Sequence, residues 1–260
     1  MTPSYLLTSG SMVALAGFIA PDTLFAFDLD GTLAPIVEEY SAAYVAEPVR
    51  AVLVRLNGLA KVAVITGRAS KDALKILGFA PHLIIGNHGA EWPNEFANTS
   101  LQFLQSCTAW KERLSELLAG VQGIELEFKG ESLSIHYRKA TDQEGALALI
   151  DAAIEKLAPS PKRIGGKLVV NLVPTEAFTK GEALMAAMER FGAERAIYFG
   201  DDETDEEVFR LKSVDVFGVH IGSNSQTAAS YYLNKQSEML GLLNSMVGIL
   251  ETAGTKKNSA

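Results

Sequence analysis

Two aspartates, Asp28 and Asp30, are the strongest chemical feature of the sequence and lie in the segment FDLDGTL at positions 27–33. The segment continues the apolar run 24–27, which is typical of a buried strand. In open parallel sheets, ligands bind at the carboxyl ends of the strands. There, one aspartate can attack a phosphorus atom, and the other can protonate the leaving oxygen and later activate water. The competing interpretation is a surface turn, because Asp-Gly is common in turns.

A second acidic segment, GDDETDEE at positions 200–207, also follows an apolar run. Six carboxylates among the seven positions 201–207 would repel one another unless solvent or a cation surrounds them. Mg²⁺ takes one or two carboxylates together with water and substrate phosphate, so the segment predicts a magnesium site. The alternative is an acidic helix N-terminus, which accounts for Glu206 and Glu207 better than for Asp201 at the strand end.

Thr66 and Lys180 are candidate phosphate ligands. Thr66 lies in VITGR at 64–68, at another strand end, and Lys180 opens a helix. A hydroxyl, glycine backbone amides, a helix N-terminus and an ammonium group all suit a phosphoryl group. Taken singly, Thr66 could be a helix cap and Lys180 a solvated surface residue. Their order along one α/β framework, between the two acidic segments, is the specific observation.

The elements that must position these residues alternate along the chain. Apolar runs at 24–27, 62–65, 83–85, 196–199 and 214–219 predict buried parallel strands. Between them, apolar residues recur at helical spacing, for example Val49, Val52, Leu53 and Leu56. We therefore predict an α/β fold in which helices cover both faces of a parallel sheet.

The middle of the chain departs from this pattern. Apolar and polar residues alternate at 124–128 and 133–137 around a turn at 129–132, which predicts an antiparallel hairpin. A helix at 142–157 and a strand at 167–173 follow. The simplest organisation is a sheet-and-helix module inserted into the α/β core. The opening residues are expected to form a short surface helix, and residues 252–260 a polar frayed tail.

Composition narrows the class of protein. The 260 residues are 48% hydrophobic and 21% charged, which excludes a disordered or fibrous chain. A net charge of -8 disfavours nucleic acid and anionic membranes as partners. The single cysteine, Cys107, cannot form an internal disulfide and fits a reducing compartment as a core residue. No basic residue precedes Arg50 and no apolar run approaches ~18–20 residues, so we expect a cytoplasmic location.

Together these motifs resemble the haloacid-dehalogenase-like phosphatases, and among them the trehalose-6-phosphate phosphatases. The resemblance covers residues 22–232 and rests on DLDGTLAPI at 28–36, ITGR at 65–68, GNHGAE at 86–91, EFKG at 127–130, HYR at 136–138, KGEA at 180–183 and GDDETDE at 200–206. It implies a Rossmann-like core, a small α/β cap and a site in the cleft between them. From the sequence pattern we expect the core to comprise residues 1–89 and 175–260 and the inserted cap residues 90–174. His88 is expected in the hinge loop.

The resemblance also implies roles for the core residues. Asp28 would be the nucleophile and Asp30 the general acid and base, while Thr66 and Lys180 would bind phosphate. The Mg²⁺ ligands would be Asp28, the backbone carbonyl of Asp30, and Asp201. Two further carboxylates, Asp202 and Asp205, would support the metal site.

In the cap, Glu127 and Lys129 match family positions that bind the sugar, and His136 and Arg138 are expected to assist. The alternative for His136 and Arg138 is ordinary cross-strand pairing in the hairpin.

The sequence departs from the family pattern in VNLVP at 170–174, where the family usually has Val-Glu-hydrophobic-basic-Pro. Asn171 can donate and accept hydrogen bonds but lacks the charge of a carboxylate, and Val173 takes the basic position.

We therefore expect a monomeric, Mg²⁺-dependent phosphatase that hydrolyses trehalose 6-phosphate to trehalose and phosphate through an aspartyl phosphate. Three alternatives stay open. Asn171 favours a phosphatase of another glycosyl phosphate, and a phosphotransferase or mutase could use the same aspartyl phosphate. The third is a non-catalytic regulator that binds sugar phosphates, and the intact pair Asp28 and Asp30 argues against it.

Overall fold

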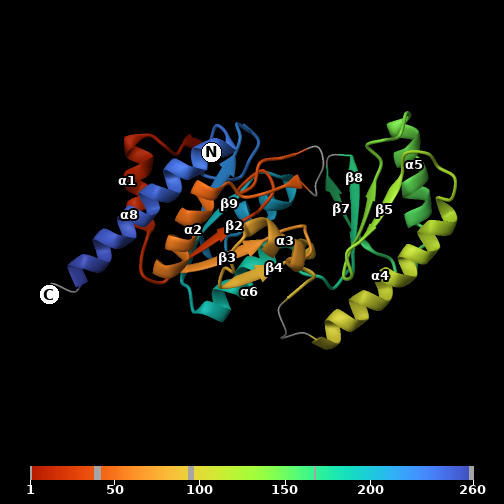
Figure 1. The fold of residues 1–260 in the computed structure, drawn as a ribbon, viewed down its shortest axis with the longest axis horizontal. Helices are drawn as coiled ribbons and strands as arrows, with labels where there is room; N and C mark the ends of the chain where they lie inside the picture. The colour runs from red at the N-terminus through yellow and green to blue at the C-terminus, as the bar shows by residue number, and fades with distance from the viewer. Residues whose placement is uncertain (1, 38–41, 93–96, 167, 258–260) are drawn as a thin grey trace. The chain divides into compact units, whose positions relative to one another are not determined.

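The computed structural model describes residues 2–37, 42–92, 97–166 and 168–257 (Figure 1). The chain divides into two compact units. The first comprises Met1–Thr66, Ser70–Ile84 and Lys180–Ala260, and the second comprises Gly67–Ala69 and Ile85–Thr179. The fold is therefore an α/β unit interrupted by an inserted unit.

The first unit is built on a seven-stranded sheet in the order β1-β11-β10-β9-β2-β3-β4. The strands are β1 (Ser4–Tyr5), β2 (Thr23–Phe27), β3 (Lys61–Ile65), β4 (Leu83–Ile85), β9 (Arg195–Gly200), β10 (Asp215–Ile221) and β11 (Tyr231–Leu233). Every pairing whose register is described is parallel. The five strands predicted from apolar runs are confirmed, and the short strands β1 and β11 were not predicted.

Helices cover both faces of this sheet. They are α1 (Ser9–Phe18), α2 (Glu47–Leu59), α3 (Ser70–Leu77), α6 (Lys180–Phe191), α7 (Glu206–Phe209) and α8 (Met239–Lys257), with short 3₁₀ turns η3 (Glu203–Asp205) and η4 (Gln236–Glu238). Alternate strand residues such as Phe25 and Phe27 point into one core with Leu53 of α2 and Leu243 of α8. Helices α2 and α8 lie side by side on that face, and α6 contacts β2 and β3 (Figure 1).

The second unit has an antiparallel sheet in the order β5-β6-β8-β7. Its elements are η2 (Asn87–Gly89), α4 (Ala97–Leu117), β5 (Glu125–Phe128), β6 (Leu133–His136), α5 (Gln143–Ile154), β7 (Lys162–Gly166) and β8 (Val169–Val173). The buried core on one face of the sheet contains Ile135, Leu172 and the helix residues Trp110 and Ile150. The predicted hairpin and the predicted helix are confirmed, and Asp142 caps α5 by accepting a hydrogen bond from the Gly145 backbone N–H.

Some sequence expectations need correction. Residues 252–257 continue helix α8 rather than forming a frayed tail, and 258–260 lie outside the described residues. The strand expected at 167–173 begins at Val169, and residue 167 is also outside the described part. Cys107 is a buried free thiol, as expected, and burial raises its pKa to about 12. Among the described residues, no helix has the length and apolar character to span a membrane.

Candidate active site

Three neighbouring strands deliver the core candidates to one edge of the sheet. Asp28 follows β2, Thr66 follows β3 and Asp201 follows β9, and these strands are adjacent and parallel in the order β9-β2-β3. Because parallel strands end at the same edge, the three residues converge there. The Asp28 backbone N–H donates to the Phe199 carbonyl at 2.8 Å, which fixes the start of the loop. Asp30 lies two residues further on, in a turn closed by the Gly31 N–H and the Ala34 carbonyl at 2.8 Å.

Lys180, the first residue of α6, is buried with two aspartates. Its Nζ donates to Asp28 Oδ1 at 2.9 Å and to Asp205 Oδ1 at 2.8 Å, and its side chain is 3% exposed. The interpretation of Lys180 as a solvated surface residue is therefore wrong. An ammonium group at this position offsets part of the negative charge of the cluster and presents a cation beside the Asp28 carboxylate.

Asp205 organises the acidic loop. Its Oδ2 accepts hydrogen bonds from the Asp201 and Asp202 backbone N–H groups at 3.0 Å, and its Oδ1 accepts from the Tyr198 hydroxyl at 2.6 Å as well as from Lys180. The sequence does not predict the hydrogen bond of Tyr198 to Asp205, because a tyrosine inside a buried strand has the same pattern as an apolar core residue. The Asp202 side chain is exposed and caps η3, accepting from the Glu203 N–H at 2.7 Å.

The cluster holds more negative than positive charge. Burial raises the pKa of Asp28 well above its usual range, and the neighbouring aspartates add to this effect while Lys180 opposes it. Burial and then Asp205 raise the pKa of Asp201 to about 7. Burial lowers the pKa of Lys180, but Asp205 and Asp28 outweigh it and raise that pKa overall, so the ammonium stays charged. The cluster therefore favours a further cation.

The oxygen atoms fit a divalent cation. One carboxylate oxygen each of Asp28, Asp201 and Asp205 lies within 4.8 Å of the others. Asp201 Oδ1 is buried and has no hydrogen-bond partner among the described residues, whereas both Asp205 oxygens accept several hydrogen bonds. Gly31, at φ +78°, leaves room for this carboxylate, since a Cβ there would lie 2.0 Å from Asp201 Oδ2. Asp28 and Asp201 are thus the available hard oxygen donors, and Asp205 supports them.

This charge excess predicts a pH-dependent stability of the metal-free protein. The folded-state pKa of Asp201 is raised to about 7, so its contribution to stability is present below the unfolded pKa and is lost as pH rises through about 7. We expect the melting temperature to fall on the order of 5 °C between about pH 5 and pH 8, and Mg²⁺ to restore more of it at the higher pH. Thermal melts with and without Mg²⁺ measure this.

The matched variants are Asp201→Asn and Asp215→Asn, the second on an exposed carboxylate at the opposite end of the strands. Only Asp201→Asn should flatten the pH dependence. An equal response from both variants would contradict the assignment of the effect to the cluster.

The second unit places its polar candidates on the sheet face opposite the apolar core. Glu127 pairs in register with Ser134, and Ser134 with Asn171, so the three side chains share one face. Glu127 Oε2 lies 2.8 Å from His136 Nε2 and 3.5 Å from Lys129 Nζ. Burial raises the pKa of Glu127, but the His136 hydrogen bond and the Lys129 charge outweigh burial and lower it. Glu127, Lys129 and His136 therefore form one polar cluster.

Asn171 and Arg138 differ from that cluster in their surroundings. The Ser134 hydroxyl donates to Asn171 Oδ1 at 2.6 Å, and both side chains are buried. The amide is thus held in one orientation by a neutral partner. Arg138 follows the end of β6 and is exposed, and its carbonyl accepts a hydrogen bond from Gln143 Nε2 at 3.4 Å.

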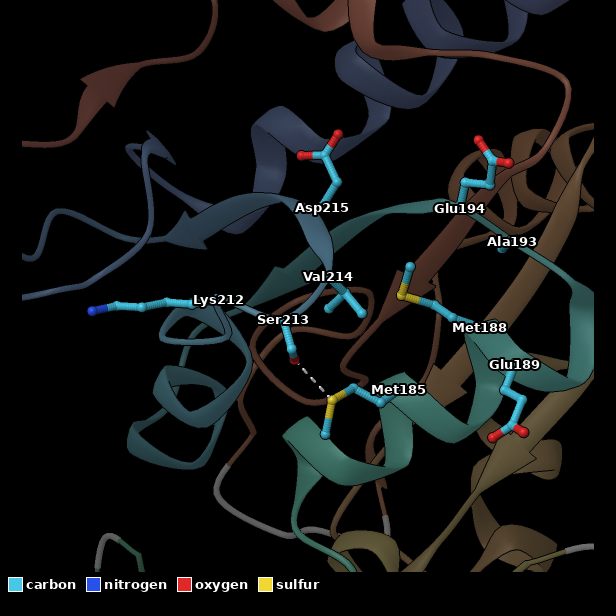
Figure 2. Close-up of a pocket in the computed structure, with 9 residues that line it drawn as sticks. All are labelled: Met185, Met188, Glu189, Ala193, Glu194, Lys212, Ser213, Val214 and Asp215. Carbon is cyan, nitrogen blue, oxygen red and sulfur yellow. Dashed lines mark hydrogen bonds between the residues drawn. The ribbon is translucent and has the colours of Figure 1, made fainter.

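A surface pocket of about 630 Å³ lies elsewhere in the first unit (Figure 2). It is lined by Met185, Met188, Glu194, Val214 and Asp215 among others, at the amino-terminal ends of β9 and β10. The aspartates and Thr66 follow the carboxyl ends of β2, β3 and β9. The pocket is therefore at the opposite edge of the sheet and is not the candidate active site.

This combination of fold and site defines a class of protein. The parallel α/β sheet has an Asp-x-Asp pair after a central strand and an acidic loop after the neighbouring strand, and a separate antiparallel sheet is inserted, which is the haloacid-dehalogenase-like fold with a cap that the sequence resemblance implies. The family model described as trehalose-phosphatase matches residues 26–237. The chain belongs to the trehalose-phosphatase family.

Individual relatives agree with this assignment. The chain is 27% identical over 256 residues to a trehalose-phosphate phosphatase of Mycobacterium marinum, covering 92% of this chain and 65% of that protein. It matches the C-terminal domain of C. albicans trehalose-6-phosphate phosphatase with a TM-score of 0.74 at 22% identity, covering 96% and 99% of the two chains. It matches Aspergillus fumigatus trehalose-6-phosphate phosphatase with a TM-score of 0.63 at 25% identity, covering 95% of this chain and 100% of that chain. The chain spans between about half and two-thirds of the length of the curated relatives.

Proposed function

We propose that this chain hydrolyses trehalose 6-phosphate to trehalose and phosphate through an aspartyl phosphate on Asp28. The observation that carries the proposal is the buried contact of Lys180 with Asp28 at the edge where three parallel strands end. The ammonium group offsets the negative charge of the carboxylate, so a phosphate dianion can approach Asp28. Without this cation, the acidic cluster would repel the phosphate. Membership of the trehalose-phosphatase family supports trehalose 6-phosphate as the substrate.

The proposed reaction uses residues of the sheet edge. Lys180 and the Thr66 hydroxyl bind the phosphoryl oxygens, and Asp28 Oδ attacks phosphorus in line with the departing sugar oxygen. Asp30 gives its proton to that oxygen as the P–O bond breaks. The Asp30 carboxylate then takes a proton from water, which attacks the aspartyl phosphate and releases inorganic phosphate.

Mg²⁺ is the cofactor that the donor set fits. Asp28, the Asp30 carbonyl and Asp201 would hold it, with Asp202 and Asp205 in support. When bound, Mg²⁺ neutralises negative charge on the transferring phosphoryl group. Lys180 cannot do this alone, because it already offsets two carboxylates.

Sugar recognition is assigned to the second unit. Glu127, Lys129, His136 and Arg138 supply hydrogen-bond donors and acceptors for hydroxyl groups, and Asn171 supplies an amide. Because Asn171 is neutral and already bonded to Ser134, a phosphatase of another glycosyl phosphate is the second candidate. A phosphotransferase would be revealed by transfer of the phosphoryl group to a sugar, and a regulator by binding of the sugar phosphate without turnover.

The cytoplasmic location, the monomeric state and the core and cap boundaries at 89–90 and 174–175 remain predictions.

Substitution of Lys129 tests the division between chemistry and sugar recognition. We expect Lys129→Met to lower kcat/KM for trehalose 6-phosphate by about 100-fold, because a sugar hydroxyl then loses its charged hydrogen-bond donor in the binding site. Turnover of p-nitrophenyl phosphate, which has no sugar, should change less than about threefold. Steady-state kinetics with both substrates measure this. Lys139→Met, on an exposed lysine of the same unit, is the control. Equal losses on both substrates would place Lys129 outside sugar recognition.

A further inference from the structure

Two side chains from outside the hairpin contact the turn between β5 and β6: the Ser100 hydroxyl of α4 donates to Glu131 Oε1, and Asn87 bonds both ends of the turn. The turn runs from Lys129 to Ser132 and is closed by a hydrogen bond from the Lys129 N–H to the Ser132 carbonyl at 3.0 Å. Asn87, in η2, is fully buried. Its Oδ1 accepts from the Ser132 hydroxyl at 2.8 Å, and its Nδ2 donates to the Lys129 carbonyl at 3.3 Å. One amide therefore binds both ends of the turn.

The partners of this amide require an asparagine. Nδ2 also donates to Glu91 Oε2 at 3.2 Å, so its two protons go to a carbonyl and a carboxylate. Neither of these groups can donate a hydrogen bond when Glu91 is ionised, which fixes the orientation of the amide. An aspartate has the same shape but would place an oxygen against two acceptors. Such a change turns two attractive contacts into repulsive ones.

The backbone at Asn87 is equally constrained. Asn87 and the following His88 have φ values of +50° and +58°, in the left-handed region that asparagine tolerates better than most residues. The Asn87 N–H donates to the Arg68 carbonyl at 2.8 Å, and the Gly86 N–H donates to the Glu91 carbonyl at 3.0 Å. Strained conformations of this kind persist when the surroundings determine them, and they concentrate at functional sites.

We propose that Asn87 is a positioning residue for Lys129. By fixing both ends of the turn, it holds the Lys129 backbone so that Nζ lies 3.5 Å from Glu127 Oε2 and 3.4 Å from the Gly67 carbonyl. Asn87 acts through the turn, because three of the four hydrogen-bonding positions of its amide, both protons and one acceptor site of Oδ1, are occupied by protein groups. The inference rests on the proposed function, in which Lys129 contacts the sugar.

The kinetic test compares Asn87→Asp with the wild-type chain. We expect Asn87→Asp to raise KM for trehalose 6-phosphate roughly tenfold or more, with kcat for p-nitrophenyl phosphate within about twofold of the wild type. Ser132→Ala, which removes one of the three contacts, should have a smaller effect in the same direction. Asn244→Asp, the same change on an exposed residue of α8, should have none.

A double-substitution cycle and hydrogen exchange separate the possible roles. If Asn87 acts through Lys129, adding Asn87→Asp to Lys129→Met raises KM little further. In Asn87→Asp the Lys129 amide should exchange at least about tenfold faster, while amides of β2 are unchanged. An unchanged exchange rate of the Lys129 amide would overturn the inference. So would a loss of activity in Asn87→Asp that is equal on both substrates and adds to the loss caused by Lys129→Met. If the wild type hydrolyses no sugar phosphate, the proposed function fails, and the exchange of the Lys129 amide still decides whether Asn87 anchors the turn.

Discussion

Asp28→Asn should lower phosphate release by about 10⁴-fold or more, because the amide removes the nucleophile while preserving the shape of the side chain. The same substitution removes one negative charge from a buried cluster of three carboxylates and one ammonium group. We therefore expect the melting temperature of the metal-free variant to equal or exceed that of the wild type. Phosphate release under saturating substrate and a thermal melt measure the two quantities separately.

The matched control is Asp22→Asn, on an exposed aspartate just before β2. It should retain wild-type turnover. A chain with Asp28→Asn that keeps a tenth or more of the activity would exclude Asp28 as the nucleophile. A large drop in melting temperature would instead show that the substitution acts through the fold.

Lys180→Met should abolish turnover and also destabilise the fold. The ammonium group is 3% exposed and bonded to two carboxylates, so its loss leaves buried negative charges without a partner. Removing one partner of a buried ion pair costs about 3–5 kcal/mol in free energy of unfolding. The loss should be largest above about pH 7, where Asp201 is also ionised. Urea unfolding and phosphate release measure the two effects.

A second variant separates charge from packing. In Lys180→Met with Asp28→Asn, one negative charge is removed along with the ammonium group, so part of the stability should return while activity stays absent. Lys212→Met, on an exposed lysine, should change neither quantity. If the double variant is no more stable than Lys180→Met, the destabilisation arises from lost packing rather than from unpaired charge.

The sequence predicts those strands and helices whose apolar and polar residues alternate or cluster according to which side chains are buried. Buried strands such as β2 and β9 read as continuous apolar runs because both faces of a parallel sheet are covered. Residues that follow such strands must meet at one edge, which is why the position of Asp28, Thr66 and Asp201 could be foreseen. Short or glycine-containing strands carry no such signal: β7 has two glycines among its five residues, and β1 has only two residues.

The hydrogen-bond partners within the site could not be predicted in this way. Asp205 was expected only as a carboxylate near the metal, and the structure shows it accepting from Tyr198, Lys180 and two backbone N–H groups. Asn87 was part of a recognised motif without a role of its own. The contact of Asp205 with Lys180 spans 25 positions of the sequence and that of Asn87 with Ser132 spans 45, and no local pattern encodes either of them.

Whether Asp28 and Mg²⁺ together hydrolyse trehalose 6-phosphate is decided by phosphate release from this substrate and from a panel of other sugar phosphates, each with and without Mg²⁺. Asp28→Asn and EDTA serve as the two negative controls. We expect kcat/KM for trehalose 6-phosphate to exceed that for the other sugar phosphates by at least about tenfold and both controls to abolish phosphate release. Preference for another glycosyl phosphate would retain the mechanism and change the substrate. Metal-independent turnover, or no release from any sugar phosphate in the presence of Mg²⁺, would contradict the proposed Mg²⁺-dependent phosphatase activity.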